Sequence, residues 1–189
     1  MPGHGGPIRR IDWLAVAVLV LLGCIFRVAN VDDLLYWHDE TYTSFRLHGY
    51  PPAEMYTALS QAPARAPNDV LRFQRPDGRG SVATTVALLA REDAQHPPLY
   101  YGLLHPWIAL FGSQPAGIRA LSVLVSLLLL PAVAWLCREL SAPPAAAPLG
   151  VALLAVSPFE VRYAQEAREY ILWGLLILLS SATLARALL

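Results

Sequence analysis

Charged residues are scarce in this sequence. Only 15% of its 189 residues are Asp, Glu, Lys or Arg, whereas 56% are hydrophobic. An ordinary soluble domain is about one quarter charged. The deficit of charge, together with a positive mean hydropathy, indicates an integral membrane protein.

The sequence also lacks an excess of basic charge. Its formal net charge is zero, and no block of like-charged residues occurs in it. Nucleic-acid binding depends on a basic field that attracts phosphates, so we expect no nucleic-acid partner. Cysteine is rare as well, because only Cys24 and Cys137 are present and both lie in apolar segments. They indicate neither a disulfide framework nor a metal site.

Apolar segments long enough to cross a membrane are present. A helix needs about 20 apolar residues to cross a bilayer, and residues 11–29, 118–137 and 170–189 meet this requirement. Residues 145–164 meet it only when Glu160 and Arg162 are included. The run from Leu21 to Cys24 resembles a lipoprotein processing site, so a signal peptide is the alternative for the first segment. Because the apolar run continues past Cys24, we expect an all-α integral membrane fold with four transmembrane helices.

The arginines that flank these segments predict the topology, because cytoplasmic loops are enriched in Lys and Arg. Arg9 and Arg10 place residues 1–10 in the cytoplasm, and residues 30–117 then form a long outer loop. In this loop, residues 54–61, 81–92 and 99–112 predict interfacial or re-entrant helices, since none is long enough for an upright span. Residues 138–144 form a cytoplasmic turn and residues 165–169 an outer loop. We expect a multi-pass protein of the cell (inner) membrane.

This topology brings three polar clusters to the outer face. The first is His38-Asp39-Glu40, an acidic pair just beyond the first span, and the second contains His96. Ionisable groups at the edge of a membrane span usually line a cavity or pair with one another. The alternative is a solvated loop with ion pairs and tyrosines that anchor to lipid headgroups. The third cluster contains Arg162, Tyr163, Glu166, Arg168 and Tyr170.

These residue types suit transfer of a group from a lipid-phosphate donor to an acceptor hydroxyl. Such a reaction needs a carboxylate that takes the acceptor proton, and cations that stabilise the charge on the departing phosphate. Asp39 can act as the base. His96, Arg162 and Arg168 can bind the phosphate, with the arginines offering bidentate geometry. The combination predicts glycosyl transfer.

Several motifs, in order, resemble the N-terminal part of the multi-spanning GT-C glycosyltransferases that use polyprenyl-phosphate sugars. This family includes protein O-mannosyltransferases and the aminoarabinose transferases that act on lipid A. The motifs are His96-Pro97-Pro98-Leu99-Tyr100-Tyr101, Leu110-Phe111-Gly112, Arg119-Ala120-Leu121-Ser122, Ser157-Pro158-Phe159 and the run from Tyr163 to Tyr170.

The resemblance implies an inverting transferase with a polyprenyl-phosphate sugar as donor and a glycan, lipid or protein as acceptor. Asp39 would be the catalytic base with Glu40 beside it, and His96 would lie near the donor phosphate. The cavity would be lined by His38, Tyr100, Tyr163, Glu166 and Tyr170. Some members bind a divalent metal and others do not. Suitable ligand types occur here but not at a motif spacing: His38, Asp39, His96 and Glu166. No cofactor is therefore assigned, and a divalent metal stays open.

Members of this family have more spans than four. We therefore expect the chain to be the N-terminal part of a longer enzyme. Two other classes stay open: a protein that binds or transports a lipid phosphate without chemistry, and a non-catalytic subunit of a larger transferase.

Overall fold

The computed structural model describes residues 12–61 and 66–189. The expected cytoplasmic segment with Arg9 and Arg10 lies outside these residues. Within them the chain is all-helical and contains no strand, which confirms the predicted all-α class. The α-helices are α1 (Trp13–Val28), α2 (His38–Leu47), α3 (Pro52–Gln61), α4 (Pro67–Leu71), α5 (Val82–Glu92), α6 (Leu99–Phe111), α7 (Pro115–Glu139), α8 (Ala146–Val156), α9 (Pro158–Ala164) and α10 (Tyr170–Leu188); a 3-10 helix, η1, covers Arg72–Gln74.

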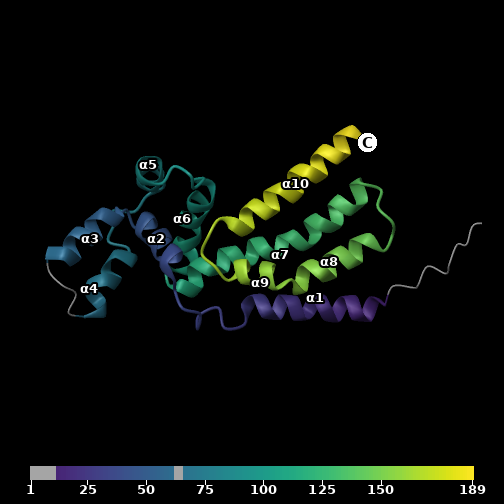
Figure 1. Ribbon diagram of the computed structural model, residues 1–189, viewed down its shortest axis with the longest axis horizontal. Coiled ribbons are helices and arrows are strands. Elements are labelled where there is room, and N and C mark those ends of the chain that lie inside the picture. Colours follow the sequence, from purple (N-terminus) through teal and green to yellow (C-terminus); the bar gives the residue numbers. More distant parts are fainter. Residues whose placement is uncertain (1–11, 62–65) are drawn as a thin grey trace, which may run out of the picture.

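A bundle of apolar helices forms the longer part of the molecule. Helix α7 packs against α8 on one side and α10 on the other, and α8 packs against α1, so the helices lie along the long axis (Figure 1). Helices α1 and α8 approach closely at Gly23, where an added Cβ would lie 2.2 Å from the carbonyl oxygen of Ala155. Only glycine fits such a crossing without a backbone shift.

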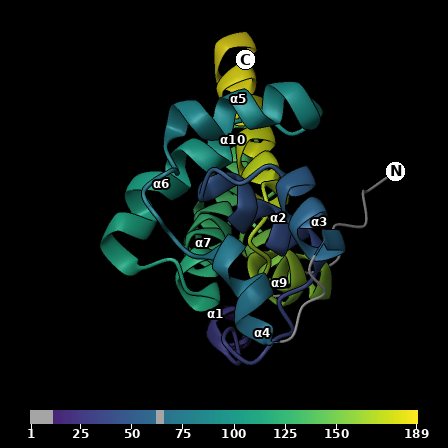
Figure 2. The same ribbon diagram turned by 90° about the vertical axis from the view of Figure 1, so that its left-hand side faces the viewer.

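The remaining helices form an outer layer, α2 to α6, at one end of the bundle. Viewed from that end, α2, α3, α4 and α5 lie across the ends of the bundle helices (Figure 2). Part of this layer has its own apolar cluster, made by Phe45, Tyr50, Met55 and Phe73. Gly49 has φ = +79°, a conformation that favours glycine. It closes the turn between α2 and α3.

Two helices, α7 and α10, are long and apolar enough to cross a membrane. Helices α1 and α8 are apolar but shorter, so two helices of residues 12–61 and 66–189 meet the length criterion, and the four predicted spans are not shown. Residues 145–164 form two helices, because α8 ends at Val156 and Ser157 begins α9, with its hydroxyl accepting the amide N–H of Glu160 at 3.4 Å. Serine followed by proline is a common helix start.

Helix α6 differs in direction from the bundle. Figure 1 shows it at the outer end of α7, crossing the direction of α7 rather than running along it. Its buried side chains, among them Tyr100 and Leu104, join the main core with Leu121 and Ile171. Its start carries His96 and the preceding residues to the place where the outer layer meets the bundle.

Candidate functional site

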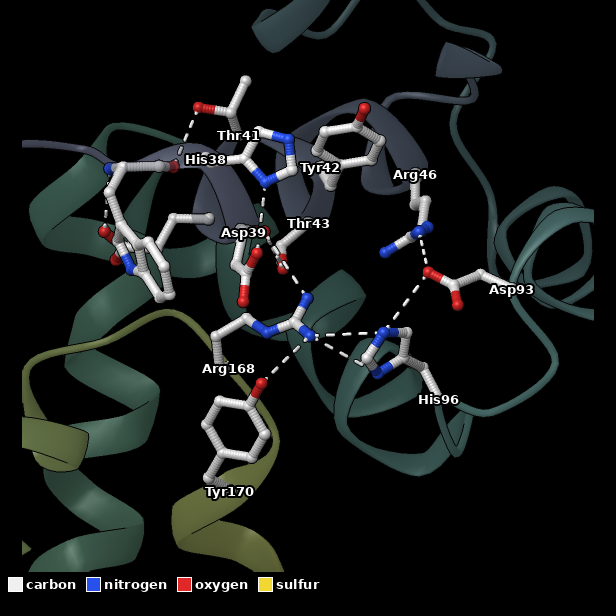
Figure 3. Close-up of polar contacts among 12 residues, drawn as sticks. His38, Asp39, Thr41, Tyr42, Thr43, Arg46, Asp93, His96, Arg168 and Tyr170 are labelled. Carbon is white, nitrogen blue, oxygen red and sulfur yellow. Dashed lines mark hydrogen bonds and ion pairs between the residues drawn. The ribbon is translucent and has the colours of Figure 1, made fainter. Parts of the chain in front are cut away.

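A polar pocket of about 390 Å³ lies between the outer layer and the loop that joins α9 to α10. Helix α2 supplies one wall, with residues spaced so that they share a face: one and two turns separate His38 from Tyr42 and Arg46. The opposite wall comes from segments before α6 and after α9 (Figure 3). The lining residues are His38, Asp39, Tyr42, Arg46, Asp93, Gln95, His96, Arg168 and Tyr170.

The first turn of α2 presents Asp39 to this pocket. The helix begins at His38 because Glu40 accepts the backbone N–H of Trp37 at 3.4 Å, and acidic residues are favourable in a first helical turn. The Asp39 carboxylate has one recorded side-chain partner, His38 Nδ1, at 3.2 Å. Asp39 is partly exposed. A carboxylate with free oxygen lone pairs at a pocket wall can accept a proton from a bound hydroxyl.

Tyr42 stands one turn from His38, beside the carboxylate. Its hydroxyl hydrogen-bonds to that of Tyr56, and this bond, followed by burial, raises the pKa of Tyr42 to about 12. The phenol is therefore protonated at neutral pH. Asp39 is the stronger candidate for a base on this wall.

His96 lies on the opposite wall, between two carboxylates. Its Nδ1 is 2.5 Å from Glu169 Oε1, and its Nε2 is 3.2 Å from Asp93 Oδ2. Arg168 Nη2 lies 3.3 Å from Nε2 as well. The imidazole is thus fixed in the wall by residues from two separate segments.

Two almost buried guanidinium groups border the pocket, Arg46 at 4% exposed and Arg168 at 3%. Arg46 forms an ion pair with Asp93, and Arg168 Nη2 lies 3.6 Å from Glu169 Oε1. Each retains one buried nitrogen without a hydrogen-bond partner, Nη1 of Arg46 and Nε of Arg168. Buried polar groups are usually satisfied. Both guanidinium groups therefore have unsatisfied hydrogen-bonding capacity beside the pocket.

Glu40, the neighbour of Asp39, points away from the pocket into the protein. It is completely buried and receives two parallel bonds from Arg119, each 2.7 Å long. Its Oε1 also accepts the backbone N–H of Ala167 at 2.8 Å. The two acidic residues that sequence analysis placed together therefore have different surroundings, and only Asp39 faces the cavity.

Other predicted residues also lie outside the pocket. Arg162 is exposed and pairs with Glu166 at 2.7 Å. Burial raises the pKa of Glu166, and Arg162 opposes the shift. Tyr100 is in the core, where its hydroxyl bonds to Ser122 at 2.8 Å.

An apolar groove of about 280 Å³ adjoins the polar pocket through Tyr170, which lines both. Tyr163, predicted to line the cavity, lies in this groove instead, with its ring 5.2 Å from that of Tyr170. Phe159 and Ile177 are largely exposed there. The groove also contains Glu160, Ile171, Trp173 and Gly174.

The site is thus a polar pocket and an apolar groove that share Tyr170. Known protein families, curated proteins and solved structures give no match to this chain. Within residues 12–61 and 66–189, no three His, Cys, Asp or Glu side chains are grouped so that they could hold a metal ion. The predicted ligand types are divided, because His38, Asp39 and His96 line the pocket whereas Glu166 pairs with Arg162.

Sequence reasoning missed three members of the site: Tyr42, Arg46 and Asp93. A signal for the first two was present, since a helix that begins at His38 places them on its face at helical spacing. Asp93 comes three residues before His96 and had no such signal. Arg119 was quoted only within a motif, although it is the partner of Glu40.

Proposed function

We propose that this chain is the N-terminal catalytic part of a membrane glycosyltransferase of the GT-C type. It transfers a sugar from a polyprenyl-phosphate donor to a hydroxyl of a glycan, lipid or protein acceptor. One observation carries the proposal: a carboxylate and two incompletely paired guanidinium groups share a pocket, and Tyr170 lines both this pocket and an apolar groove. An amphiphile with an anionic head has this shape and chemistry.

In the proposed reaction, Asp39 accepts the proton of the acceptor hydroxyl. The hydroxyl oxygen forms a bond to the anomeric carbon of the sugar, and the bond from that carbon to the phosphate oxygen breaks with inversion. The electron pair stays on the phosphate, where new negative charge develops. Arg168 and Arg46 stabilise that charge with the guanidinium groups that border the pocket, because preorganised donors at a developing anion lower the barrier. His96, held by Asp93 and Glu169, adds a polar wall.

The proposed membrane arrangement follows from the groove. Phe159, Trp173 and Ile177 face outward from α9 and α10, and the polyprenyl chain lies against them within the bilayer. Helices α7 and α10 cross the membrane, and α1 and the α8–α9 pair complete a four-span arrangement with a cytoplasmic N-terminus. The outer layer and its pocket then lie at the outer lipid boundary of the inner membrane.

The decisive experiment replaces Asp39 with Asn in the full-length enzyme and measures transfer of labelled sugar from the lipid donor. Loss of a general base should lower the rate by about a hundredfold or more. Asp33→Asn is the matched control, because Asp33 is an exposed carboxylate in the same outer segment and does not line the pocket. A near-normal rate for Asp39→Asn excludes the catalytic assignment.

The same assay separates the other classes. A lipid-phosphate carrier moves the labelled donor intact and releases no sugar, and an accessory subunit transfers sugar only when a second membrane protein is added. Chelation with EDTA, followed by addition of Mg²⁺ or Mn²⁺, tests the divalent metal. Loss and recovery of transfer would establish a metal requirement.

A further inference from the structure

We propose that Arg119 and Glu40 form a positioning pair that sets the separation between Asp39 and Arg168 across the pocket. This inference rests on the proposed function, because it assigns a task to residues that do not touch the substrate. Arg119 is 1% exposed and Glu40 is 0% exposed. Neither lines the pocket, so neither can contact a substrate held there.

The Glu40 carboxylate connects the two walls. On the α2 side, Glu40 directly follows Asp39 in the chain. On the other side, its Oε1 accepts the N–H of Ala167 at 2.8 Å, and Ala167 directly precedes Arg168. Asp39 is thus the chain neighbour of Glu40 itself, and Arg168 is the chain neighbour of the residue whose N–H binds the Glu40 carboxylate. A shift of that carboxylate moves both walls.

Arg119 fixes the carboxylate in turn. Its Nε and Nη2 bind the two oxygens of Glu40 at 2.7 Å each, a planar bidentate arrangement that lysine cannot reproduce. It also donates to backbone carbonyls in the segment that leads into α2: those of Val31 at 2.7 Å, Leu34 at 3.1 Å and Leu35 at 3.1 Å. Arg119 lies on α7, the most buried helix of the bundle. The ion pair therefore anchors both walls of the pocket to α7.

A misplacement of about 1 Å can slow an enzyme a hundredfold without removing any catalytic group. Loss of the pair should therefore lower kcat by about tenfold or more and leave the donor KM within about threefold, because the groove and the guanidinium groups remain. A purely structural role predicts instead that the remaining folded enzyme has normal kcat.

A measurement of spacing tests the inference without relying on activity. Cysteines are placed at positions 39 and 168 in a chain with Cys24→Ala and Cys137→Ala, and are treated with bifunctional thiol reagents of increasing length. Replacing Arg168 also removes its own contact with the Asp39 carbonyl, so the separation no longer depends on that contact. We expect one reagent length to dominate.

The pair is then removed as a neutral unit with Glu40→Gln/Arg119→Gln, and separately weakened with Arg119→Lys. The first variant avoids a lone buried charge, and the second keeps the charge but loses the parallel bonds. Both should broaden crosslinking over several reagent lengths. If the double variant does not fold, Arg119→Lys decides the result.

Arg27→Gln is the matched control. Arg27 is also completely buried and binds backbone carbonyls, but it has no contact with the pocket. It should leave one dominant length. Equal broadening by Arg27→Gln, or unchanged crosslinking and kcat in the Arg119 variants, overturns the positioning role. Full activity of Asp39→Asn instead refutes the proposed function, and the crosslinking result still reports on the pair.

Discussion

The two buried arginines of the bundle stand in regions of different character. Arg27, at the crossing of α1 and α8, binds neutral acceptors: Ser126 Oγ at 2.5 Å and the carbonyls of Gly23, Leu154 and Ala155. Arg119, where the bundle meets the outer layer, binds a buried carboxylate as well as carbonyls. In the first region the guanidinium binds only neutral acceptors and attracts Glu160 through space, whereas in the second it forms a hydrogen-bonded ion pair.

The two arginines therefore have different structural roles: Arg27 stabilises the packing of the bundle, and Arg119 stabilises the site as well. The carbonyls of Leu154 and Ala155 belong to the last turn of α8, where backbone oxygens lack partners in the helix. Arg27 thus acts as a cationic cap between two helices. Arg119 neutralises a carboxylate that also holds the loop before Arg168. We expect changes at Arg27 to loosen helix packing, and changes at Arg119 to disturb the pocket as well.

The largest effect should come from Arg119→Leu. It leaves Glu40 as a buried, unpaired carboxylate, and removal of one partner of a buried ion pair costs about 3–5 kcal/mol. Denaturant unfolding in detergent micelles measures this loss. The double variant Glu40→Leu/Arg119→Leu should be less damaging than Arg119→Leu alone. A loss below about 1 kcal/mol would mean that the carboxylate finds another partner.

Arg27→Leu should cost less, about 2–3 kcal/mol, because it removes charge-assisted hydrogen bonds to neutral acceptors and only a through-space attraction to the partly buried Glu160. Sugar transfer by the protein that remains folded should stay near normal. The same unfolding measurement applies, combined with the transfer assay. A loss of transfer as large as that of Arg119→Leu would remove the distinction between the two regions.

A pH change sharpens the comparison, because the arginines stay charged throughout while the outer layer contains a buried histidine. Burial, followed by the nearby His105, lowers the pKa of His48 to about 4, although Asp77 acts in the opposite direction. In the unfolded chain the imidazole has a pKa of about 6.5 and binds a proton first. The outer layer should therefore lose stability as the pH falls from about 6.5 towards 4.

After allowance for solvent screening, this loss should be about 2 kcal/mol. Thermal unfolding in detergent at pH 7 and pH 5 measures it. His48→Gln should weaken the pH dependence, since glutamine does not titrate in this range. An unchanged pH dependence in that variant would assign the effect to other groups.

Local features of this chain were predictable from its sequence. The helices predicted at residues 54–61 and 81–92 correspond to α3 and α5. Composition and hydrophobic periodicity reveal such helices because they reflect interactions within one or two helical turns. Five residues predicted for the site line one pocket: His38, Asp39, His96, Arg168 and Tyr170. Their convergence could be anticipated because hydropathy and the arginines that flank the apolar segments together placed these residues at one face.

Pairings over long distances in the sequence were not predictable. Arg46 and Asp93 are 47 residues apart, and Arg119 and Glu40 are 79 apart. Adjacent residues on a helix point in different directions, so Asp39 and Glu40 cannot share one role once α2 begins at His38. The sequence shows that Asp39 and Glu40 are adjacent. It does not show that a helix begins at His38 and directs their side chains to different surroundings.

The smallest effect should come from Tyr100→Phe, which tests the boundary of the pocket. Tyr100 was predicted to line the cavity, but its hydroxyl is buried and bonds to Ser122. Removal of that hydroxyl should cost about 1 kcal/mol of stability. Adding Ser122→Ala should recover part of the loss, because no buried hydroxyl is then left without its partner. Transfer should stay within about twofold, since the loss of a neutral core hydrogen bond alters no charge in the pocket. A fall in transfer comparable with that of Asp39→Asn would mean that the functional cavity extends into the α6–α7 core.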